Sequence, residues 1–405
     1  MLSNMKMKLR RVLQRINNIK FAVFFYLLTS TLLSVTIFLR LEGLSFDIIK
    51  YANVSFYFLN YLGGSLVALY YLMSTLIIPK KQVMSKQSLP ILKLTLISIL
   101  VSAILILISP YGILPEYISL IIPVLLAYAT YIAWLKPRGN HTKIKRASVI
   151  ALLLIIGILL PYVTVFAFEN NVLSQAANVA SPKDKVQSIV RFVQNIPTFN
   201  IYRSYDDFWK YLLVGTGACH ETAMATVTLL NNLSFEARTV VLPGEDHAFV
   251  EVKINGTWLV VDPGYNVTEP ITRKQRAAKR IQEMGAISYV ITHSGSSFIE
   301  LTSFYVPTDT ITIKVTNGNE PLVNAQVFLL HEFMSGTKRL PDADTSFFTD
   351  GNGETTFRLG ALTYNENAKE YDTCYWIYVN GKDTGYNVTS TGTGITRLIE
   401  IDLHQ

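Results

Sequence analysis

The chain has 405 residues, 50% of them hydrophobic, and 36 Lys and Arg against 29 Asp and Glu give a formal net charge of +7. The basic excess lies near the N-terminus, because the part from residue 169 onward holds 19 basic and 26 acidic residues. A nucleic-acid-binding protein needs a basic patch on its folded domain. The charge distribution gives no support to such a patch, so we expect no nucleic-acid partner.

Five apolar runs dominate the first 169 residues, and each is predicted to cross a membrane as a helix. The runs lie at about 21–39, 54–78, 91–109, 115–135 and 147–168. Basic residues cluster before the first run, between the second and third, and between the fourth and fifth, which the positive-inside rule assigns to the cytoplasm. We therefore predict a multi-pass protein of the cell membrane, with a cytoplasmic N-terminus, a lipid bilayer as partner, and all residues after Phe168 extracytoplasmic.

Two helices are predicted next. Ser181 and Pro182 are typical of a helix start, and the apolar residues of 183–196 recur at helical spacing. The segment 205–213 has the composition of a second, shorter helix. A Gly-rich turn, 215–218, then leads into Cys219, the first residue of an expected helix over 219–233. The positive end of a helix dipole favours a thiolate, so we expect Cys219 to be a nucleophile.

A strand is predicted at 236–242, followed by a β-hairpin. Two alternating runs, 247–254 and 257–263, are separated only by Asn255-Gly256, the strongest short-range hairpin signal. This turn pairs Ile254 with Thr257, which places His247 and Asp262 on the same face of the hairpin as diagonal neighbours. A slip of one residue would separate them. We therefore predict a pair between the His247 imidazole and the Asp262 carboxylate.

Three linked motifs carry a family resemblance. Gly217-x-Cys219-x-x-x-Ala, a strand with Arg238-x-Val, and His247-Ala-Phe-Val-Glu-Val followed by Trp-x-x-x-Asp262-Pro resemble the transglutaminase-like superfamily. The resemblance implies an α+β, papain-like fold with a catalytic triad. In it Cys219 is the nucleophile, His247 the general base and acid, and Asp262 the carboxylate that orients the histidine.

The chain departs from this family at two points. His220 follows the nucleophile, where many relatives have Arg or Gly, and the oxyanion donor is not fixed, with Trp209 and Gln194 as candidates. We expect a membrane-anchored extracytoplasmic thiol enzyme that acts on amide bonds of proteins or peptides, with hydrolysis favoured over amine transfer. The alternative is an inactive binding or scaffold module. We expect no cofactor and no metal.

The part of the chain after residue 272 is predicted to contain one more helix and then a domain built only of strands. Residues 273–284 form a basic amphipathic helix, which would have a solvated face or lie on lipid headgroups. Five alternating runs between 308 and 403, separated by Asn-Gly and Asp-Gly turns, predict an all-β sandwich. This part resembles carboxypeptidase-regulatory-like (prealbumin-like) domains, which implies a spacer or binding module. The predicted organisation is thus a transmembrane region at 1–169, a transglutaminase-like domain at 170–305 and a β-sandwich at 306–405.

Overall fold

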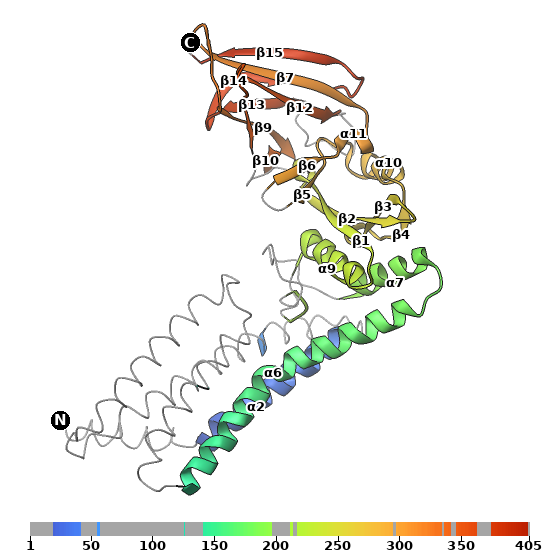
Figure 1. Cartoon of the computed structure of the whole chain (residues 1–405), viewed down its shortest axis with the longest axis vertical. Coiled ribbons are helices and arrows are strands. Elements are labelled where there is room, and N and C mark those ends of the chain that lie inside the picture. The colour runs from blue at the N-terminus through green and yellow to red at the C-terminus, as the bar shows by residue number, and fades with distance from the viewer. Residues whose placement is uncertain are drawn as a thin grey trace, which may run out of the picture. The chain divides into compact units, whose positions relative to one another are not determined.

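The computed structural model describes residues 19–41, 55–56, 125, 141–196, 211–213, 217–294, 297–333, 336–341, 346–362 and 374–403 (Figure 1). The chain divides into two compact units. The first comprises Met1–Asn171 and Asn195–Thr216, and the second comprises Val172–Gln194 and Gly217–Gln405. Each unit is described by itself below.

Two long helices represent the first unit. They are α2 (Ile19–Leu41) and α6 (His141–Ala177), and the end of α6, from Val172 onward, belongs to the second unit. They pack closely, because a Cβ atom added to Gly157 on α6 would lie 2.6 Å from the Tyr26 ring on α2. Glycine is the residue that permits such an approach of backbone to side chain.

The prediction of a bundle of five transmembrane helices is wrong. Among the described residues one helix, at Ile155–Ala177, is long and apolar enough to cross a membrane, and the apolar part of α2 is the shorter Tyr26–Leu39. Apolar runs do not distinguish a span from a helix that packs inside a protein, and α2 buries Leu33 and Ile37. The runs at 54–78, 91–109 and 115–135 lie outside the described residues, except for 55–56 and 125.

The first helix of the second unit after the end of α6 is α7 (Pro182–Asn195), which confirms the predicted helix start at Pro182. Its centre is a six-stranded sheet in the order β4-β3-β2-β1-β5-β6. The strands are β1 (Glu236–Leu242), β2 (His247–Ile254), β3 (Thr257–Asp262), β4 (Val267–Ile271), β5 (Ile291–Ser294) and β6 (Ser297–Glu300). The strand β1 and the β2–β3 hairpin were predicted, whereas β4, β5 and β6 were not.

The hairpin register agrees with the prediction. Ile254 pairs with Thr257, and the ladder runs back to Val250 opposite Val261. Asn255 and Gly256 have φ values of 50° and 80°, which is the conformation of a type I′ turn. The register therefore places His247 and Asp262 on one face of the hairpin, as the turn had indicated.

Helices contact both sides of this sheet. Helix α9 (Cys219–Asn232) packs on β1 and β2, and α10 (Arg273–Met284) packs on β3. Side chains on the α10 side form a core with the short helix α11 (Thr302–Tyr305). Because residues alternate between the two faces of a strand, His247 and Glu251 lie on the same face of β2 as Phe249, which belongs to this core.

Two further sheets follow, which confirms that the C-terminal part is built from sheets. One has the order β10-β9-β13-β14, with β11 paired to β9, and the other has the order β12-β7-β15, with β8 paired to β7. The five strands that the alternating runs predicted are β7 (Thr308–Asn317), β9 (Gln326–Phe333), β12 (Glu354–Gly360), β13 (Tyr375–Val379) and β15 (Thr396–Asp402). The strands that they missed are β8 (Glu320–Pro321), β10 (Gly336–Leu340), β11 (Phe347–Phe348) and β14 (Lys382–Val388).

The two C-terminal sheets share one hydrophobic core with part of the neighbouring domain. Ile311 and Ile313 of β7 meet Leu329 of β9 in this core. Tyr289 and Ile291, at the start of β5 in the six-stranded sheet, belong to it as well. A backbone hydrogen bond, in which Gly360 N–H donates to Ser288 O at 2.9 Å, joins the two parts again. The C-terminal sheets and the six-stranded sheet are therefore packed together within one unit.

Candidate active site

The nucleophile candidate sits where the sequence placed it. Cys219 is the first residue of α9, and the Glu221 carboxylate accepts a hydrogen bond from Ala218 N–H at 2.7 Å, which closes the first turn. The thiol is half-buried and free. Its sulfur lies 4.0 Å from the backbone carbonyl oxygen of Asp246, the residue before β2. The start of α9 is thus held against the start of the strand that carries His247.

His247 and Asp262 form the predicted pair. The His247 Nε2 atom lies 2.7 Å from Asp262 Oδ2, and both side chains are buried. A carboxylate can only accept a hydrogen bond from Nε2, so the proton is on Nε2 and the lone pair is on Nδ1. The histidine therefore offers Nδ1 as the nitrogen that can take a proton.

The carboxylate of Asp262 has a second partner that the sequence did not indicate. Arg276 on α10 donates two hydrogen bonds to Asp262 Oδ2, from Nε at 3.1 Å and from Nη2 at 2.7 Å. Gly264 N–H donates to the other carboxylate oxygen at 3.1 Å. Asp262 thus receives donors from a histidine, an arginine and its own loop, which fix its orientation.

These contacts set the protonation states of the pair. Burial alone would raise the pKa of Asp262, but the neighbouring His247 and Arg276 outweigh it and lower the pKa. For His247 burial has the largest effect and lowers the pKa, against the opposite effect of Asp262. The resting pair at neutral pH is therefore an ionised Asp262 beside a neutral imidazole.

The expectation of a thiolate at Cys219 is wrong for this resting geometry. Burial raises the pKa of the thiol, and the negative charges of Asp246 and Asp262 raise it further. The backbone N–H groups of Ala248 and His220 lower it, but they do not compensate. The helix position was predicted correctly, yet desolvation of the charged form outweighs the helix dipole here. Cys219 is a neutral thiol until a base accepts its proton.

All three predicted residues converge on Gly264, in the short helix η5 (Pro263–Tyr265) after Asp262. A Cβ atom added to Gly264 would lie 3.4 Å from Asp262 Oδ1, 3.5 Å from His247 Cε1 and 3.6 Å from Cys219 Cβ. The three side chains therefore surround a single point. The Tyr265 ring packs edge-on against the His247 ring at 4.7 Å and limits its rotation.

The loop before His247 carries buried charge. It is the short helix η4 (Pro243–Glu245), followed by Asp246 in a left-handed conformation with a φ of 47°. Glu245 is 1% exposed, and its Oε1 atom accepts a hydrogen bond from Ser288 N–H at 2.7 Å. Burial raises the pKa of Glu245 from its ordinary 4.5 to about 7. The residue beside the catalytic candidates is therefore a carboxyl group that titrates near neutrality.

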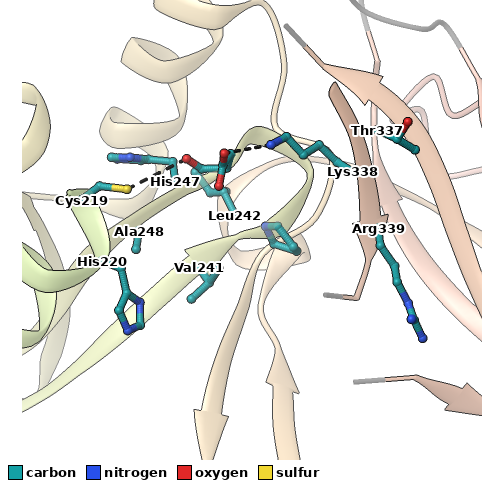
Figure 2. Close-up of a pocket in the computed structure, with 11 residues that line it drawn as sticks. Cys219, His220, Val241, Leu242, His247, Ala248, Thr337, Lys338 and Arg339 are labelled. Atoms are coloured by element: carbon teal, nitrogen blue, oxygen red, sulfur yellow. Dashed lines mark hydrogen bonds and ion pairs between the residues drawn. The ribbon is translucent and has the colours of Figure 1, made fainter. Parts of the chain in front are cut away.

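A cleft of about 360 Å³ opens at the candidate nucleophile. In Figure 2 the Cys219 sulfur and the His247 ring lie next to each other at one side of it, and Lys338 reaches across from β10. Eleven residues line the cleft: Cys219, His220, Val241, Leu242, Pro243, Asp246, His247, Ala248, Thr337, Lys338 and Arg339. Asp262 is not among the lining residues and contacts the lining through its hydrogen bond to His247.

The basic helix predicted at 273–284 provides arginines that pair with buried carboxylates, which its composition did not indicate. As α10 it does not present these arginines to solvent or to lipid headgroups, because Arg276 and Arg280 are each only 1% exposed. Arg276 holds Asp262, and Arg273 pairs with the buried Glu251 through Nε at 2.5 Å. The spacing of three and four residues between these arginines was the available signal, since it places them on one helical face with the buried Ala277.

Gln194 and Trp209 are the candidates for the oxyanion donor. Gln194 donates from Nε2 to Asn266 Oδ1 at 2.9 Å on an exposed surface, and Trp209 lies outside the described residues. In the part of the chain that the structure describes, no group of three or more His, Cys, Asp or Glu side chains could hold a metal ion.

A cysteine at the start of a helix, packed on an antiparallel sheet that bears a His–Asp pair, defines an α+β domain with the layout of thiol-dependent acyl-transfer proteins. Residues 170–263 match the family model described as the transglutaminase-like superfamily, so the chain contains a transglutaminase-like domain. Members of this superfamily are commonly cysteine-dependent hydrolases or acyltransferases. Neither the comparison with curated proteins nor the comparison with solved structures gives a match. The prealbumin-like resemblance therefore stays a prediction.

Proposed function

We propose that this protein is a thiol enzyme that cleaves amide bonds of proteins or peptides through an acyl-enzyme on Cys219. The observation that carries the proposal is the His247–Asp262 hydrogen bond of 2.7 Å beside Cys219, at the mouth of a cleft. A buried histidine with its Nε2 proton held by an ionised carboxylate is in the tautomer that a general base requires.

The reaction follows from the protonation states. His247 Nδ1 takes the proton of the Cys219 thiol as the sulfur attacks the acyl carbon, and the imidazolium that forms is stabilised by Asp262. Backbone N–H groups in the first turn of α9 have no partner within the helix, so they can bind the oxyanion. His247 then gives the proton to the leaving amine. Water, activated by the same nitrogen, releases the acyl group as a carboxylic acid.

We propose further that α6 anchors the enzyme in a membrane. The stretch Ile155–Ala177 has the length and composition of a span. The N-terminal end of α6 carries Lys143, Lys145 and Arg146, and basic flanks of this kind stay on the cytoplasmic side. The transglutaminase-like domain follows the other end of α6. It would therefore meet its substrate outside the cytoplasm.

The alternative is a scaffold with an inactive site. The observation in its favour is that burial raises the pKa of the Cys219 thiol, because a protonated thiol is a poor nucleophile. The two proposals differ in what happens when an acyl donor is supplied. The enzyme forms a covalent adduct with the donor at Cys219, whereas the scaffold leaves the donor intact.

The test is to incubate the purified full-length chain with an activated peptide ester and to follow its mass. We expect a mass increase equal to the acyl group, located on Cys219, that disappears with time as water hydrolyses it. Addition of a primary amine separates the two resolutions, since a transferase converts the acyl group into an amide. Cys219→Ala is the control. If the wild-type chain gains no acyl group and consumes no ester above the level of Cys219→Ala, the scaffold is correct.

A further inference from the structure

The far wall of the cleft at Cys219 comes from the C-terminal part of the chain. Thr337, Lys338 and Arg339 of β10 line it, opposite the start of α9 and the start of β2 (Figure 2). Strand β10 lies at the end of its sheet and contacts η4, the loop that precedes His247. A peptide bound at Cys219 would thus lie between the transglutaminase-like domain and β10.

The charge of this cleft is opposite to that of the part of the chain that contains it. From residue 169 onward the chain is net acidic, with 26 acidic and 19 basic residues. Among the residues that line the cleft, Lys338 and Arg339 carry positive charge and only Asp246 carries negative charge. The remaining lining is mostly apolar, with Val241, Leu242, Pro243 and Ala248 beside the histidines. Lys338 is the cation that reaches toward the candidate nucleophile, whereas the Arg339 guanidinium points away from it, lies 4.0 Å over the Phe328 ring and donates to Ser346 Oγ at 2.6 Å (Figure 2).

Lys338 forms a solvent-exposed ion pair with Asp246, the residue whose backbone contacts Cys219. Its Nζ atom lies 2.8 Å from Asp246 Oδ2, and the Asp246 carbonyl oxygen is the one that lies 4.0 Å from the Cys219 sulfur. The two side chains of this ion pair are 23% and 54% exposed. Exposed ion pairs contribute little to stability. A carboxylate of a bound substrate can therefore take the place of Asp246 at Lys338 with little loss.

We propose that β10 is part of the substrate site and that Lys338 selects acyl donors with a carboxylate side chain next to the scissile carbonyl. The proposal rests on the proposed function, since it names the substrate class for the same site. The acyl chain lies along the apolar lining, its carbonyl carbon faces Cys219, and its carboxylate pairs with Lys338.

The experiment compares two acetyl-dipeptide vinyl sulfones that differ only in a terminal Glu or Gln side chain. In the labelling step the Cys219 sulfur adds to the vinyl group, and the proton from the thiol passes by way of His247 to the carbon beside the sulfone. The readout is the ratio of second-order labelling rates, Glu probe over Gln probe, measured by the mass of the full-length chain. We expect a ratio of at least about three in the wild type, which is the scale of an exposed ion pair.

Three variants test the assignment. Lys338→Gln should bring the ratio to about one, and Asp246→Asn, which frees Lys338, should raise it above that of the wild type. The matched control is Lys314→Gln, because Lys314 pairs with Glu400 at 3.5 Å with a side chain that is 33% exposed, on strands that do not line the cleft. It should leave both rates unchanged. Should Lys338→Gln fail to fold, high salt must lower the wild-type ratio instead.

The possible failures are distinguishable. Labelling of Cys219 by both probes at equal rates in the wild type, or a ratio that survives Lys338→Gln, overturns the role of Lys338 and leaves the proposed function intact. If iodoacetamide alkylates Cys219 while neither vinyl sulfone does, the site does not accept peptides, and both the inference and the proposed function fail.

Discussion

Glu245→Gln should remove a pH dependence of stability that the structure assigns to one buried carboxyl group. Glu245 is fully enclosed, and its Oε2 atom has no hydrogen-bond partner among the described residues. Burial has the largest effect and raises the pKa to about 7, although the Ser288 side chain, the Ser288 N–H and the guanidinium of Arg280 each stabilise the carboxylate. His331 also faces this loop, since its Nε2 atom would lie 2.7 Å from a Cβ atom at Gly244.

The sign and size of the effect follow from these values. Because the folded state binds the proton more tightly than the unfolded state, the stability that Glu245 contributes is complete below its ordinary pKa of 4.5. It is lost as the pH rises through about 7. At about 1.4 kcal/mol for each pK unit, the loss is about 3 kcal/mol. Glutamine keeps the acceptor for Ser288 N–H and carries no charge at any pH.

The assay is urea unfolding of the full-length wild type and Glu245→Gln at pH 5 and pH 8.5. The free energy of unfolding of the variant minus that of the wild type should rise by about 2.5 kcal/mol between these pH values, because a part of the contribution is already lost at pH 5. Taking this difference cancels the titration of other groups. Glu236→Gln is the control, because the Glu236 side chain is 62% exposed. A difference for Glu245→Gln that is the same at both pH values would refute the reasoning.

Three further predictions concern the site and its hairpin. Asp262→Asn should abolish acylation and also lower the free energy of unfolding by up to about 3 kcal/mol, because buried Arg276 then keeps, among the described residues, only Glu283, at 3.3 Å, as an anionic partner. Adding Arg276→Met should restore stability, measured by urea unfolding, without restoring acylation. The rate of alkylation of Cys219 by iodoacetamide should keep rising with pH beyond pH 8, since burial raises the pKa of the thiol; a plateau from pH 6 would show a preformed thiolate. Gly256→Val should lower the free energy of unfolding by about 1–3 kcal/mol, because Gly256 has a positive φ. Gly351 also lies in open space but has no positive φ, so Gly351→Val should change the free energy of unfolding by less than about 0.5 kcal/mol.

Local signals predicted the core of the site well. Asn255-Gly256 fixed the register, and the register placed His247 and Asp262 on one face. These interactions join residues that are close in the sequence. The strand and helix periodicities of the sequence are therefore sufficient to predict them. The same reasoning failed for the thiolate, because the burial of Cys219 and the charges of Asp246 and Asp262, which raise the pKa of its thiol, arise only from the tertiary fold.

Long-range contacts were the main source of error. The arginines of α10 were read as a solvated or lipid-facing surface, since composition does not show that Asp262 and Glu251 lie beneath them. Strand β10 was missed because Gly336–Leu340 is short and half-exposed, without a clear alternation of apolar residues. The five-span prediction failed for a related reason. A hydrophobic run indicates that a segment is buried, but it does not indicate whether lipid or other parts of the protein bury it.

The core that joins the C-terminal sheets to the six-stranded sheet has a consequence for how the protein can be divided. A cut after Tyr305 would strip the partners from Tyr289 and Ile291 and leave an apolar surface on the fragment that keeps Cys219. Such a surface invites aggregation. The two parts are therefore expected to unfold in a single cooperative transition, and a shortened chain would have to keep the residues through Asp402 to remain soluble. The C-terminal sheets therefore fold together with the domain that carries Cys219 and cannot be removed from it as a separate module.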